Sequence, residues 1–470
     1  MIRIKKEESC GMRNSRLDRI RITPGQLIPA SFLLVIIIGA LLLMLPISSA
    51  SGESVGALTA LFTSTTSVCV TGLVVVDTYA EWSVFGQFVI MILIQIGGLG
   101  VVAIGSMVMI LSRKKVNLGV RKLLGESLNL ERDAGLLRFL IRVFKGVFVV
   151  ELAGTVLCAI VFIPMMGFSK GLWAALFQSI SAFCNAGMDL IGPNSMIDLR
   201  TSGILMSTTM ILIVLGGIGF VVWFDVIDGI RAARRNRYGI RTMISHLPEH
   251  TKLVITMTLF LIIGGAAFVF ISEYSNPDTL GNLSLGGKIA NSLFQSITFR
   301  TAGFATLPQE KLKEATCMLG YILMFIGGSP VGTAGGIKTV TAFLFFVNAL
   351  SYIRGRKENV VFNRGVSEEL MRKAAAIAFV SIGTVFVMTI LLLTRGGIAL
   401  TDAVYEVISA LGTVGLSRAI TPRLDTIGRV IIIISMYLGR IGPISMAIFF
   451  TKGISSSSKI KHAEGTFRVG

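Results

Sequence analysis

The chain has few of the side chains that acid–base and metal chemistry require. Its 470 residues include only three histidines, five cysteines and 26 acidic residues, against 44 basic ones. His246 and His250 have the spacing of a metal-binding pair, but Pro248 between them breaks the helix that would put both rings on one face. The cysteines show no metal-ligand spacing, and we interpret them as small apolar fillers: Cys10, Cys69, Cys158, Cys184 and Cys317.

Other catalytic and cofactor signals are also missing. Carboxylates within the apolar segments are sparse, and Glu151, Asp225 and Asp228 lie near expected span ends or helix contacts, which argues against a proton relay. The chain contains neither a strand followed by a GxGxxG motif nor a Walker sequence, so we predict that it binds no nucleotide itself. These shortages argue against an enzyme.

Apolar residues dominate what is present. They make up 53% of the chain, and the mean hydropathy is +0.77, which indicates a polytopic membrane protein. Eight apolar runs are long enough to cross a bilayer. They lie at about 27–47, 84–111, 139–163, 204–230, 253–272, 317–350, 374–394 and 427–450. The first run is as long as a true span and follows about two dozen polar residues, so it is not a cleavable signal peptide.

The charged residues lie between these runs and predict the topology. Basic residues crowd the N-terminal tail and the segments 113–145, 231–241 and 354–373, so the positive-inside rule places both termini in the cytoplasm. This placement also argues against nucleic acid as the partner, despite a net charge of +18. Acidic residues gather on the opposite side, where they either concentrate cations or form ordinary solvated loops. They are Glu53, Asp77, Glu81, Asp189, Asp198, Glu273, Asp278, Asp402 and Asp425.

Four short segments repeat one pattern. They are LFTSTTSVCVTGL (61–73), LFQSISAFCNAGM (176–188), LFQSITFRTAGF (293–304) and VYEVISALGTVGL (404–416). An aromatic residue near the start precedes a glycine by ten positions in three copies and by nine in the third copy along the chain. Each segment is too short to cross the bilayer as a helix, so we predict four re-entrant loops around a central pseudo-fourfold pore.

The end of each loop forms a triplet that closes with the shared glycine. A turn or packing role would explain any one of these glycines, whereas four in register favour a ring of backbone carbonyls that replaces the water shell of a cation. The triplets carry no carboxylate, which favours a weakly hydrated monovalent ion over a divalent one. The predicted filter residues are Val70, Thr71, Gly72, Asn185, Ala186, Gly187, Thr301, Ala302, Gly303, Thr413, Val414 and Gly415.

The span after each loop carries a second repeated motif: IGGLG at 96–100, LGGIG at 215–219, IGGSP at 326–330 and LGRIG at 438–442. Close helix packing is a sufficient explanation for the first two copies. The third copy continues into a segment too rich in glycine for an uninterrupted helix, and we predict a gate there, with a mere kink as the alternative. The gate residues are Gly327, Gly328, Ser329, Pro330, Gly332, Thr333, Ala334, Gly335, Gly336 and Lys338. Lys338 marks the cytoplasmic end of this loop and is not an ion ligand.

Arg440 takes the place of a glycine in the fourth copy. An arginine at membrane depth is costly and usually pairs or faces water. It would either slow cation flow below the filter, or form a salt bridge or an anchor for the glycine-rich loop, and these roles are compatible.

These motifs resemble the Trk/Ktr/HKT superfamily of potassium transporters, and most closely the bacterial Ktr-type (KtrB-like) membrane subunit. The loops with CVTGL, CNAGMDL, RTAGF and GTVGLS, the segment GGSPVGTAGGIK and the late arginine carry the resemblance, which covers about residues 25–452. It implies a homodimer in the cell membrane with one pore per subunit, regulated by a ring of cytoplasmic nucleotide-binding subunits of the RCK/KTN type. Within the family, serine in place of the first filter glycine is associated with sodium transport, so Gly72 favours potassium as the transported ion.

Several points stay open. Sodium dependence is common among Ktr-type members, so Na⁺ is a candidate coupling ion of a symporter, but no residue identifies its site. A sodium-permeable transporter of the same superfamily and a non-conducting membrane receptor or scaffold are the alternatives. The basic linkers would dock a regulatory subunit or bind anionic lipid.

The expected organisation follows from these assignments. It comprises a cytoplasmic tail (1–24), pore repeat 1 (25–112), a basic cytoplasmic linker (113–138), pore repeat 2 (139–230), a second basic linker (231–251), pore repeat 3 (252–353) with an intramembrane loop (327–338), a third cytoplasmic linker (354–371), pore repeat 4 (372–452) and a C-terminal tail (453–470).

Overall fold

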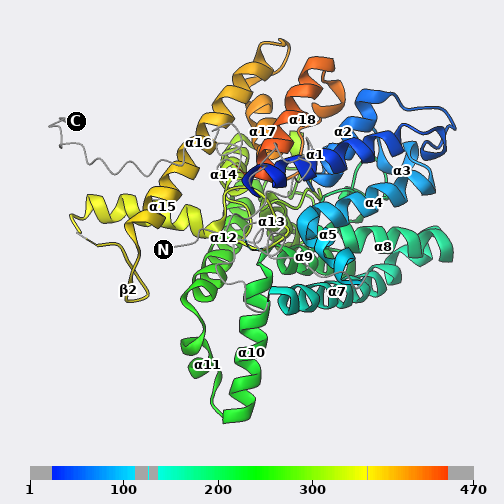
Figure 1. The fold of residues 1–470 in the computed structure, drawn as a ribbon. Coiled ribbons are helices and arrows are strands. Elements are labelled where there is room, and N and C mark those ends of the chain that lie inside the picture. Colours follow the sequence, from blue (N-terminus) through cyan, green and yellow to red (C-terminus); the bar gives the residue numbers. More distant parts are fainter. Residues whose placement is uncertain (1–23, 112–124, 126–135, 357, 443–470) are drawn as a thin grey trace, which may run out of the picture.

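The described part of the chain is almost entirely helical (Figure 1). The computed structural model describes residues 24–111, 125, 136–356 and 358–442. Most of the predicted N-terminal tail and of the 113–138 linker, the end of repeat 4, the C-terminal tail, Cys10 and His462 therefore lie outside the described residues. A two-stranded hairpin, β1 (Val360–Val361) with β2 (Arg364–Gly365), is the only sheet within the described ranges. The predicted helical membrane fold is confirmed.

Each repeat begins with a long apolar helix. These helices are α1 (Pro24–Leu43), α7 (Leu136–Met166), α12 (Glu249–Glu273) and α16 (Glu368–Leu393). All four are long and apolar enough to cross a bilayer. Much of their apolar surface is exposed, as at Phe148, Phe260 and Phe379, because a helix in lipid keeps an apolar outer face. They correspond to the predicted first spans.

A short helix follows each long one. These four pore helices are α2 (Ala57–Val68), α8 (Phe168–Cys184), α13 (Leu285–Phe299) and α17 (Leu400–Gly412). They contain 12 to 17 residues. That gives lengths of roughly 18–26 Å, less than the hydrocarbon thickness of a bilayer. Most of their side chains are buried, polar ones included, which agrees with the predicted re-entrant geometry.

The second spans of repeats 1 to 3 are interrupted at their glycine motifs, and the described part of the fourth span ends at its motif. The helices are α4 (Val84–Leu99) with α5 (Val101–Leu111), α9 (Gly203–Gly217) with α10 (Phe220–Asn236), α14 (Glu314–Phe325) with α15 (Thr339–Ile353), and α18 (Thr426–Ile441). Gly100 and Gly219 divide the first two spans with φ of 91° and 95°, and the second pair bends by 98°. The apolar runs predicted at 84–111 and 204–230 are therefore each divided between two helices, which the sequence analysis did not predict, because these motifs end a helix as well as pack it.

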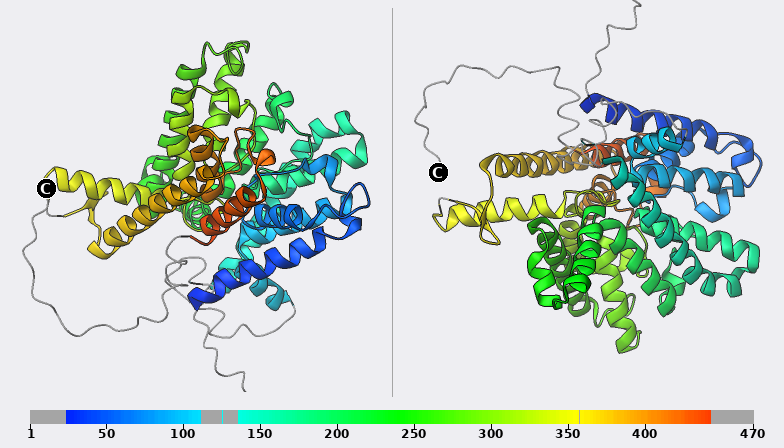
Figure 2. Two further views of the ribbon diagram at one scale, coloured as in Figure 1. Left: turned by 90° about the horizontal axis from the view of Figure 1, so that it is seen from above. Right: turned by 60° about the horizontal axis from the view of Figure 1, so that its bottom comes forward.

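Short elements complete the chain. They are η2 (Pro46–Ser48), α3 (Thr78–Glu81), η3 (Ile197–Leu199), α11 (Ile240–His246), η4 (Gln309–Lys311) and η5 (Thr421–Arg423). Figure 1 shows α10 and α11 as a helical hairpin that projects from the bundle, so the predicted linker at 231–241 is largely helical. Leu247 and Pro248 separate α11 from α12, as the HLPEH sequence predicted. In Figure 2, α15 and α16 extend together away from the other helices.

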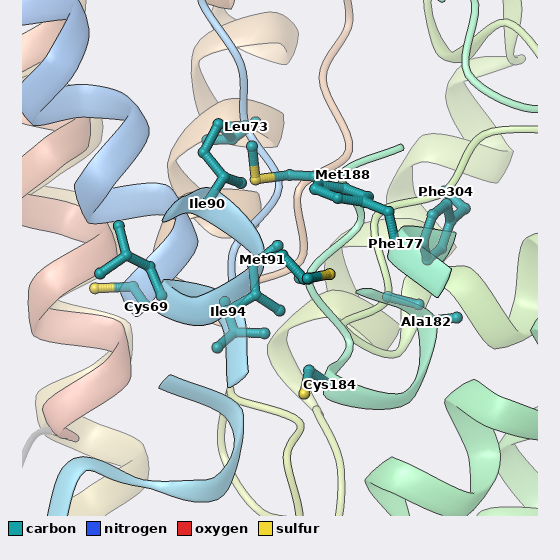
Figure 3. Close-up of a cluster of buried hydrophobic side chains, with 14 of the residues drawn as sticks. Cys69, Leu73, Ile90, Met91, Ile94, Phe177, Ala182, Cys184, Met188 and Phe304 are labelled. Atoms are coloured by element: carbon teal, nitrogen blue, oxygen red, sulfur yellow. The ribbon is translucent and has the colours of Figure 1, made fainter. Parts of the chain in front are cut away.

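Buried apolar side chains fill the space between the pore helices and the second spans (Figure 3). Cys69 and Cys184 lie in this cluster beside Ile94, from three different helical segments. Both thiols are buried and free, as are Cys158 and Cys317. The surroundings of Cys69 and Cys158 agree with the interpretation of these cysteines as small apolar fillers, whereas the Cys184 thiol contacts the Gln95 side chain and the Cys317 sulfur accepts from Arg418.

One contact fastens the pore helix to the first span in repeats 1 to 3. A serine hydroxyl of the pore helix donates to a carbonyl oxygen of the first span, and a glycine three residues further along that span allows the close approach. The bonds are Ser64 to Ile36 at 2.7 Å, Ser179 to Glu151 at 2.6 Å and Ser296 to Ile262 at 2.8 Å, beside Gly39, Gly154 and Gly265. Repeat 4 has Val407 at the equivalent position and lacks this bond.

Neighbouring glycines of α12 provide a test of this packing. A Cβ added at Gly265 would meet the Ser296 hydroxyl and, at 2.9 Å, a methyl carbon of Leu323, whereas one at Gly264 meets nothing within 4 Å. We expect Gly265→Ala to lower the free energy of unfolding by about 1–3 kcal/mol. Thermal unfolding in detergent would measure this. Gly264→Ala is the matched control, and equal stability of the two variants would contradict the packing account.

Candidate functional site

The four predicted triplets share one unusual backbone conformation. Their first residues all have positive φ: 54° at Val70, 61° at Asn185, 66° at Thr301 and 50° at Thr413. Their glycines follow with φ of 99°, 67°, 84° and 96° in the same order. Positive φ is costly for β-branched residues, so the surrounding structure must impose it at Val70, Thr301 and Thr413, whereas asparagine tolerates it at position 185.

The last turn of each pore helix holds the triplet in this conformation. In repeats 1, 2 and 4 the amide of the middle residue donates at 2.8 Å to the carbonyl five residues earlier: Thr71 to Thr66, Ala186 to Ser181 and Val414 to Ser409. These bonds are typical of a helix that ends in a left-handed residue. In repeat 3, Ala302 donates instead to Thr298, four residues earlier, at 3.1 Å. That difference accounts for the shorter aromatic-to-glycine spacing in this copy.

Hydroxyl side chains of the pore helices reinforce the same turn. Thr66 accepts from the Gly72 amide at 3.0 Å, and Ser409 accepts from the Gly415 amide at 3.1 Å. Ser181 accepts from Met188, the residue after the glycine, at 3.1 Å. In repeat 3 the direction reverses, and Thr298 donates to the carbonyl of Phe304 at 2.6 Å. The sequence interpretation missed these residues, although each lies at a matching position in the repeated segments.

The four triplet glycines form a closed ring, which we call the glycine ring (Gly72, Gly187, Gly303 and Gly415). A Cβ built on each glycine would meet the middle carbonyl oxygen of the next repeat. The pairs are Gly72 with Ala186, Gly187 with Ala302 at 2.8 Å, Gly303 with Val414 at 2.6 Å, and Gly415 with Thr71. The fourth repeat thus closes onto the first, and the triplets surround one axis. Any side chain at these positions would displace a ring carbonyl.

The intramembrane loop (327–338) is held closed at its ends. α14 ends at Phe325 and α15 begins at Thr339. Between them the Gly327 amide donates to the Ile337 carbonyl at 3.0 Å, and the Ile337 amide donates to the Phe325 carbonyl at 3.0 Å. The predicted break of this span is therefore present as a compact loop and not as a bend in a continuous helix.

This loop lies against the first residues of two triplets. The Thr333 hydroxyl donates to the carbonyl of Phe183 at 3.0 Å and lies 3.4 Å from the side-chain oxygen of Asn185. A Cβ on Gly335 would collide with the hydroxyl of Thr413. The intramembrane loop therefore covers the side of the glycine ring formed by the first residues of the triplets. The chain segments that follow the four glycines lie on the opposite side.

Further bonds attach the loop to the end of α9. The amides of Ser329 and Thr333 donate to the carbonyls of Gly217 and Gly216 at 2.9 and 3.0 Å, and the Phe220 amide donates to the Val331 carbonyl at 3.0 Å. The Lys338 ammonium donates to the Ala334 carbonyl at 2.6 Å, within the loop itself.

Arg440 joins the loop to repeat 1. Its guanidinium donates to the Thr333 carbonyl at 2.7 Å and to the carbonyl of Gly97. Within the described residues it forms no ion pair, so the predicted salt bridge is not present there. The arrangement is that of the predicted anchor, because one charged group bonds both the loop and the end of α4.

The segments that follow the glycines, which we call the mouth loops (73–83, 188–202, 304–313 and 416–425), engage much of the predicted acidic side. Asp77 accepts from the Tyr79 amide at 2.7 Å, and Asp189 accepts from the Ser195 hydroxyl at 2.6 Å. Asp425 accepts from the Gly428 amide at 2.8 Å; this bond, together with Arg395, holds the pKa of Asp425 below its usual range. These carboxylates organise local structure, and a role in concentrating cations stays a prediction.

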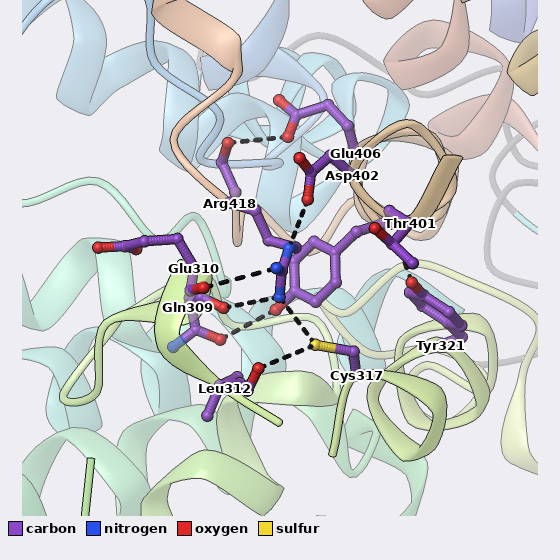
Figure 4. Close-up of polar contacts among 11 residues, drawn as sticks. Gln309, Glu310, Leu312, Cys317, Tyr321, Thr401, Asp402, Glu406 and Arg418 are labelled. Atoms are coloured by element: carbon purple, nitrogen blue, oxygen red, sulfur yellow. Dashed lines mark hydrogen bonds and ion pairs between the residues drawn. The ribbon is translucent and has the colours of Figure 1, made fainter. Parts of the chain in front are cut away.

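Arg418 connects the mouth loops of repeats 3 and 4 (Figure 4). It pairs with Asp402 at 2.6 Å and donates to the Gln309 carbonyl at 3.2 Å and to the Cys317 sulfur at 3.0 Å. Tyr405 donates to the Gln309 side chain at 2.9 Å. The sequence analysis assigned no role to Arg418, whose partners Gln309 and Cys317 lie about a hundred residues away in the chain.

Comparison with known proteins places this geometry among cation transporters. The family model described as TrkH, cation transport protein, matches residues 15–461. The chain is 39% identical over 451 residues to Ktr system potassium uptake protein B of Bacillus subtilis, and 35% identical over 457 residues to potassium/sodium uptake protein NtpJ of Enterococcus hirae. Each alignment covers 96% of this chain and 98% of the relative.

A solved structure shares the fold. The crystal structure of the potassium transporter TrkH from Vibrio parahaemolyticus superposes with a TM-score of 0.71 at 16% identity, covering 94% of this chain and 87% of that one. At this identity the likeness concerns the fold alone.

Proposed function

Because this chain belongs to the TrkH family of cation transport proteins, we propose that it takes up potassium across the cell membrane through the glycine ring. The membership confirms the resemblance drawn from the loop motifs, and the family is one of transporters and not of enzymes. K⁺ is then the transported ion, and the chain itself binds no nucleotide.

The observation that carries this proposal is the closed ring. Four middle carbonyls, from Thr71, Ala186, Ala302 and Val414, lie against four glycines around one axis. Such carbonyls can replace the water shell of a weakly hydrated cation. The hydroxyls of Thr71, Thr301 and Thr413 are buried without a hydrogen-bond partner in the described part of the chain, so they add polar oxygens near the ring.

Sodium offers the second candidate function. The name of the relative NtpJ includes sodium as well as potassium, so either a sodium-permeable transporter or sodium-dependent potassium uptake is compatible with the family. Gly72 favours potassium, since it leaves the ring without a side-chain oxygen at that position. The other alternative is a receptor or scaffold that conducts no ions.

The intramembrane loop acts in this proposal as the gate, with Arg440 as the anchor that keeps it under the ring. We expect Thr333→Val to raise ion flux roughly fivefold, since it removes one hydrogen bond worth about 1 kcal/mol from the closed position. Flux into liposomes measures this. Thr384→Val is the control, because that hydroxyl bonds only to Val380 within α16 at 2.8 Å. Equal ion flux in the Thr333→Val and Thr384→Val variants would contradict a gating role for the loop.

The partners and the orientation follow the same reasoning. We propose a homodimer in the cell membrane with both termini in the cytoplasm, regulated by a ring of nucleotide-binding subunits of the RCK/KTN type. Support comes from the relatives named as component B of a Ktr system and from basic residues on the projecting hairpin, including Arg234, Arg235 and Arg241. Anionic lipid would attract the same charges, so both contacts are proposed for this hairpin.

Uptake of rubidium into liposomes tests the function directly. The purified chain should take up Rb⁺, and K⁺ should compete better than Na⁺. Added Na⁺ that stimulates uptake without competing would identify sodium dependence, whereas better competition by Na⁺ would favour the sodium transporter. If the well-folded chain takes up no Rb⁺ alone or with a cytoplasmic nucleotide-binding subunit added, the potassium proposal fails.

A further inference from the structure

A small cavity, lined mostly by apolar side chains with three polar ones among them, lies between α9, α12, α13 and the intramembrane loop. Its lining includes Asn185, Ile213, Gly217, Thr258, Arg300 and Gly328. The centre of a water-sized sphere can occupy about 20 Å³ of it. That space suffices for one or two water molecules or a single monoatomic ion, but not for a carboxylate or phosphate group.

Three lining residues carry a buried polar atom without a partner in the described part of the chain. These atoms are Nδ2 of Asn185, Oγ1 of Thr258 and Nε of Arg300. The side chains come from three different helical segments and are 1%, 4% and 8% exposed. Buried polar atoms normally find a partner, so three such atoms on one cavity indicate a bound species.

The hydrogen-bonding capacity of these three groups determines which ligand can bind in the cavity. The Asn185 amide nitrogen and the Arg300 Nε can only donate hydrogen bonds, and the Thr258 hydroxyl can donate one as well. A cation would be repelled by the Arg300 charge and, among these three groups, would find lone pairs only on the Thr258 hydroxyl. The ligand must therefore be an acceptor, either a water oxygen or an anion.

The charge of Arg300 decides between these two. Its guanidinium donates to the Gly327 carbonyl at 3.2 Å, but it forms no ion pair with any described residue. Arg418 differs, since Asp402 balances its charge. Arg440 also lacks an ion pair, but it donates to the carbonyls of Thr333 and Gly97, whereas the Arg300 Nε has no acceptor in the described residues. A buried charge without a counter-charge is strongly unfavourable, and a water molecule would not neutralise it.

We propose that the cavity binds a halide ion, chloride under ordinary conditions, between Arg300, Asn185 and Thr258. Arg300 precedes Gly303 of the ring by three residues. A bound anion would offset the repulsion between this guanidinium and a cation in the ring, so halide binding would favour cation occupancy. The site rests on the cavity and its donors and not on transport.

Bromide supplies the direct test, because its anomalous scattering separates it from water. Crystals of the whole chain grown in bromide should show an anomalous peak within the cavity. The melting temperature should also rise with bromide or chloride concentration relative to gluconate at constant ionic strength, since a ligand that binds only the folded state stabilises it.

Two threonine variants make the test specific. Thr258→Val should raise the halide concentration needed for a given stabilisation about fivefold, because one hydrogen bond to the anion is lost. Thr389→Val is the control: its hydroxyl is likewise buried and unpartnered in the described residues, but it lies on α16, away from the cavity lining. Arg300→Gln should abolish the halide dependence if the variant folds.

Each outcome of these experiments either supports the halide site or overturns it. A bromide peak in the cavity, with a halide response weakened in Thr258→Val but not in Thr389→Val, supports the site. A cavity that holds only water in bromide-grown crystals overturns it, as does a halide response that Thr258→Val leaves unchanged. Neither readout depends on ion flux, so failure of the halide site and failure of the transport proposal are distinguishable.

Discussion

Replacing Gly72 by serine is expected to lower the preference of uptake for potassium over sodium at least tenfold. Gly72 has φ of 99°, and a Cβ there would meet the carbonyl oxygen of Ala186. That carbonyl must turn or shift, so the ring loses the spacing that suits potassium, while the new hydroxyl offers a ligand to the smaller ion. A loss of about 1.4 kcal/mol in discrimination gives the tenfold change. Rubidium uptake with potassium and sodium as competitors measures it.

Gly56→Ser separates the ring from backbone strain. Gly56 precedes α2 in the same repeat and has φ of 85°, but a Cβ there meets nothing within 4 Å. This variant should have similar strain yet unchanged ion selectivity. Equal selectivity of Gly72→Ser and the wild-type chain would exclude Gly72 from the ion path.

Shortening the intramembrane loop by removing residues 332–336 should raise flux by about 10- to 100-fold and weaken dependence on any regulatory partner. The deletion removes Thr333, which bonds the Phe183 carbonyl and whose own carbonyl accepts from Arg440, and Gly335, which packs under Thr413. Bonds to a charged donor contribute about 1.5–3 kcal/mol each, which sets the size of the effect. Initial rates of rubidium uptake would measure it.

Arg440→Gln provides a second variant that keeps the loop length. It removes the charge that holds the loop to Gly97, so flux should rise in the same direction as in the shortened chain. Arg429→Gln, on the same helix, is the control, since Arg429 bonds the carbonyls of Leu424 and Pro422 near the mouth loops. Flux that is unchanged in both the shortened chain and Arg440→Gln would contradict the gate.

The sequence predicted the features that recur in register. Four copies of one loop pattern located the triplets, and an excess of glycine located the loop at 327–338, because both signals are local. The breaks at Gly100 and Gly219 were missed, since the same motifs also pack: Gly97 and Gly216 lie against the carbonyls of Val68 and Phe183. A short glycine motif has the same sequence whether it lets helices pack closely or ends a helix.

Other features depend on contacts that no local pattern records. Val70 and Thr413 adopt positive φ against the preference of β-branched residues, because the pore-helix turn and the neighbouring repeats impose it. In the sequence Arg300 is an ordinary part of the third loop, whereas the structure shows that it lines the same cavity as Asn185 and Thr258. These assignments require the relative positions of repeats 2 and 3.

The central claim is that the glycine ring binds a dehydrated monovalent cation through backbone carbonyls. Diffraction from crystals of the whole chain in rubidium tests it most directly, since Rb⁺ scatters anomalously and substitutes for K⁺. The account predicts an anomalous peak on the axis, within the carbonyls of Thr71, Ala186, Ala302 and Val414, and its loss in excess potassium. An ordered ring without such a peak at saturating rubidium would contradict the claim.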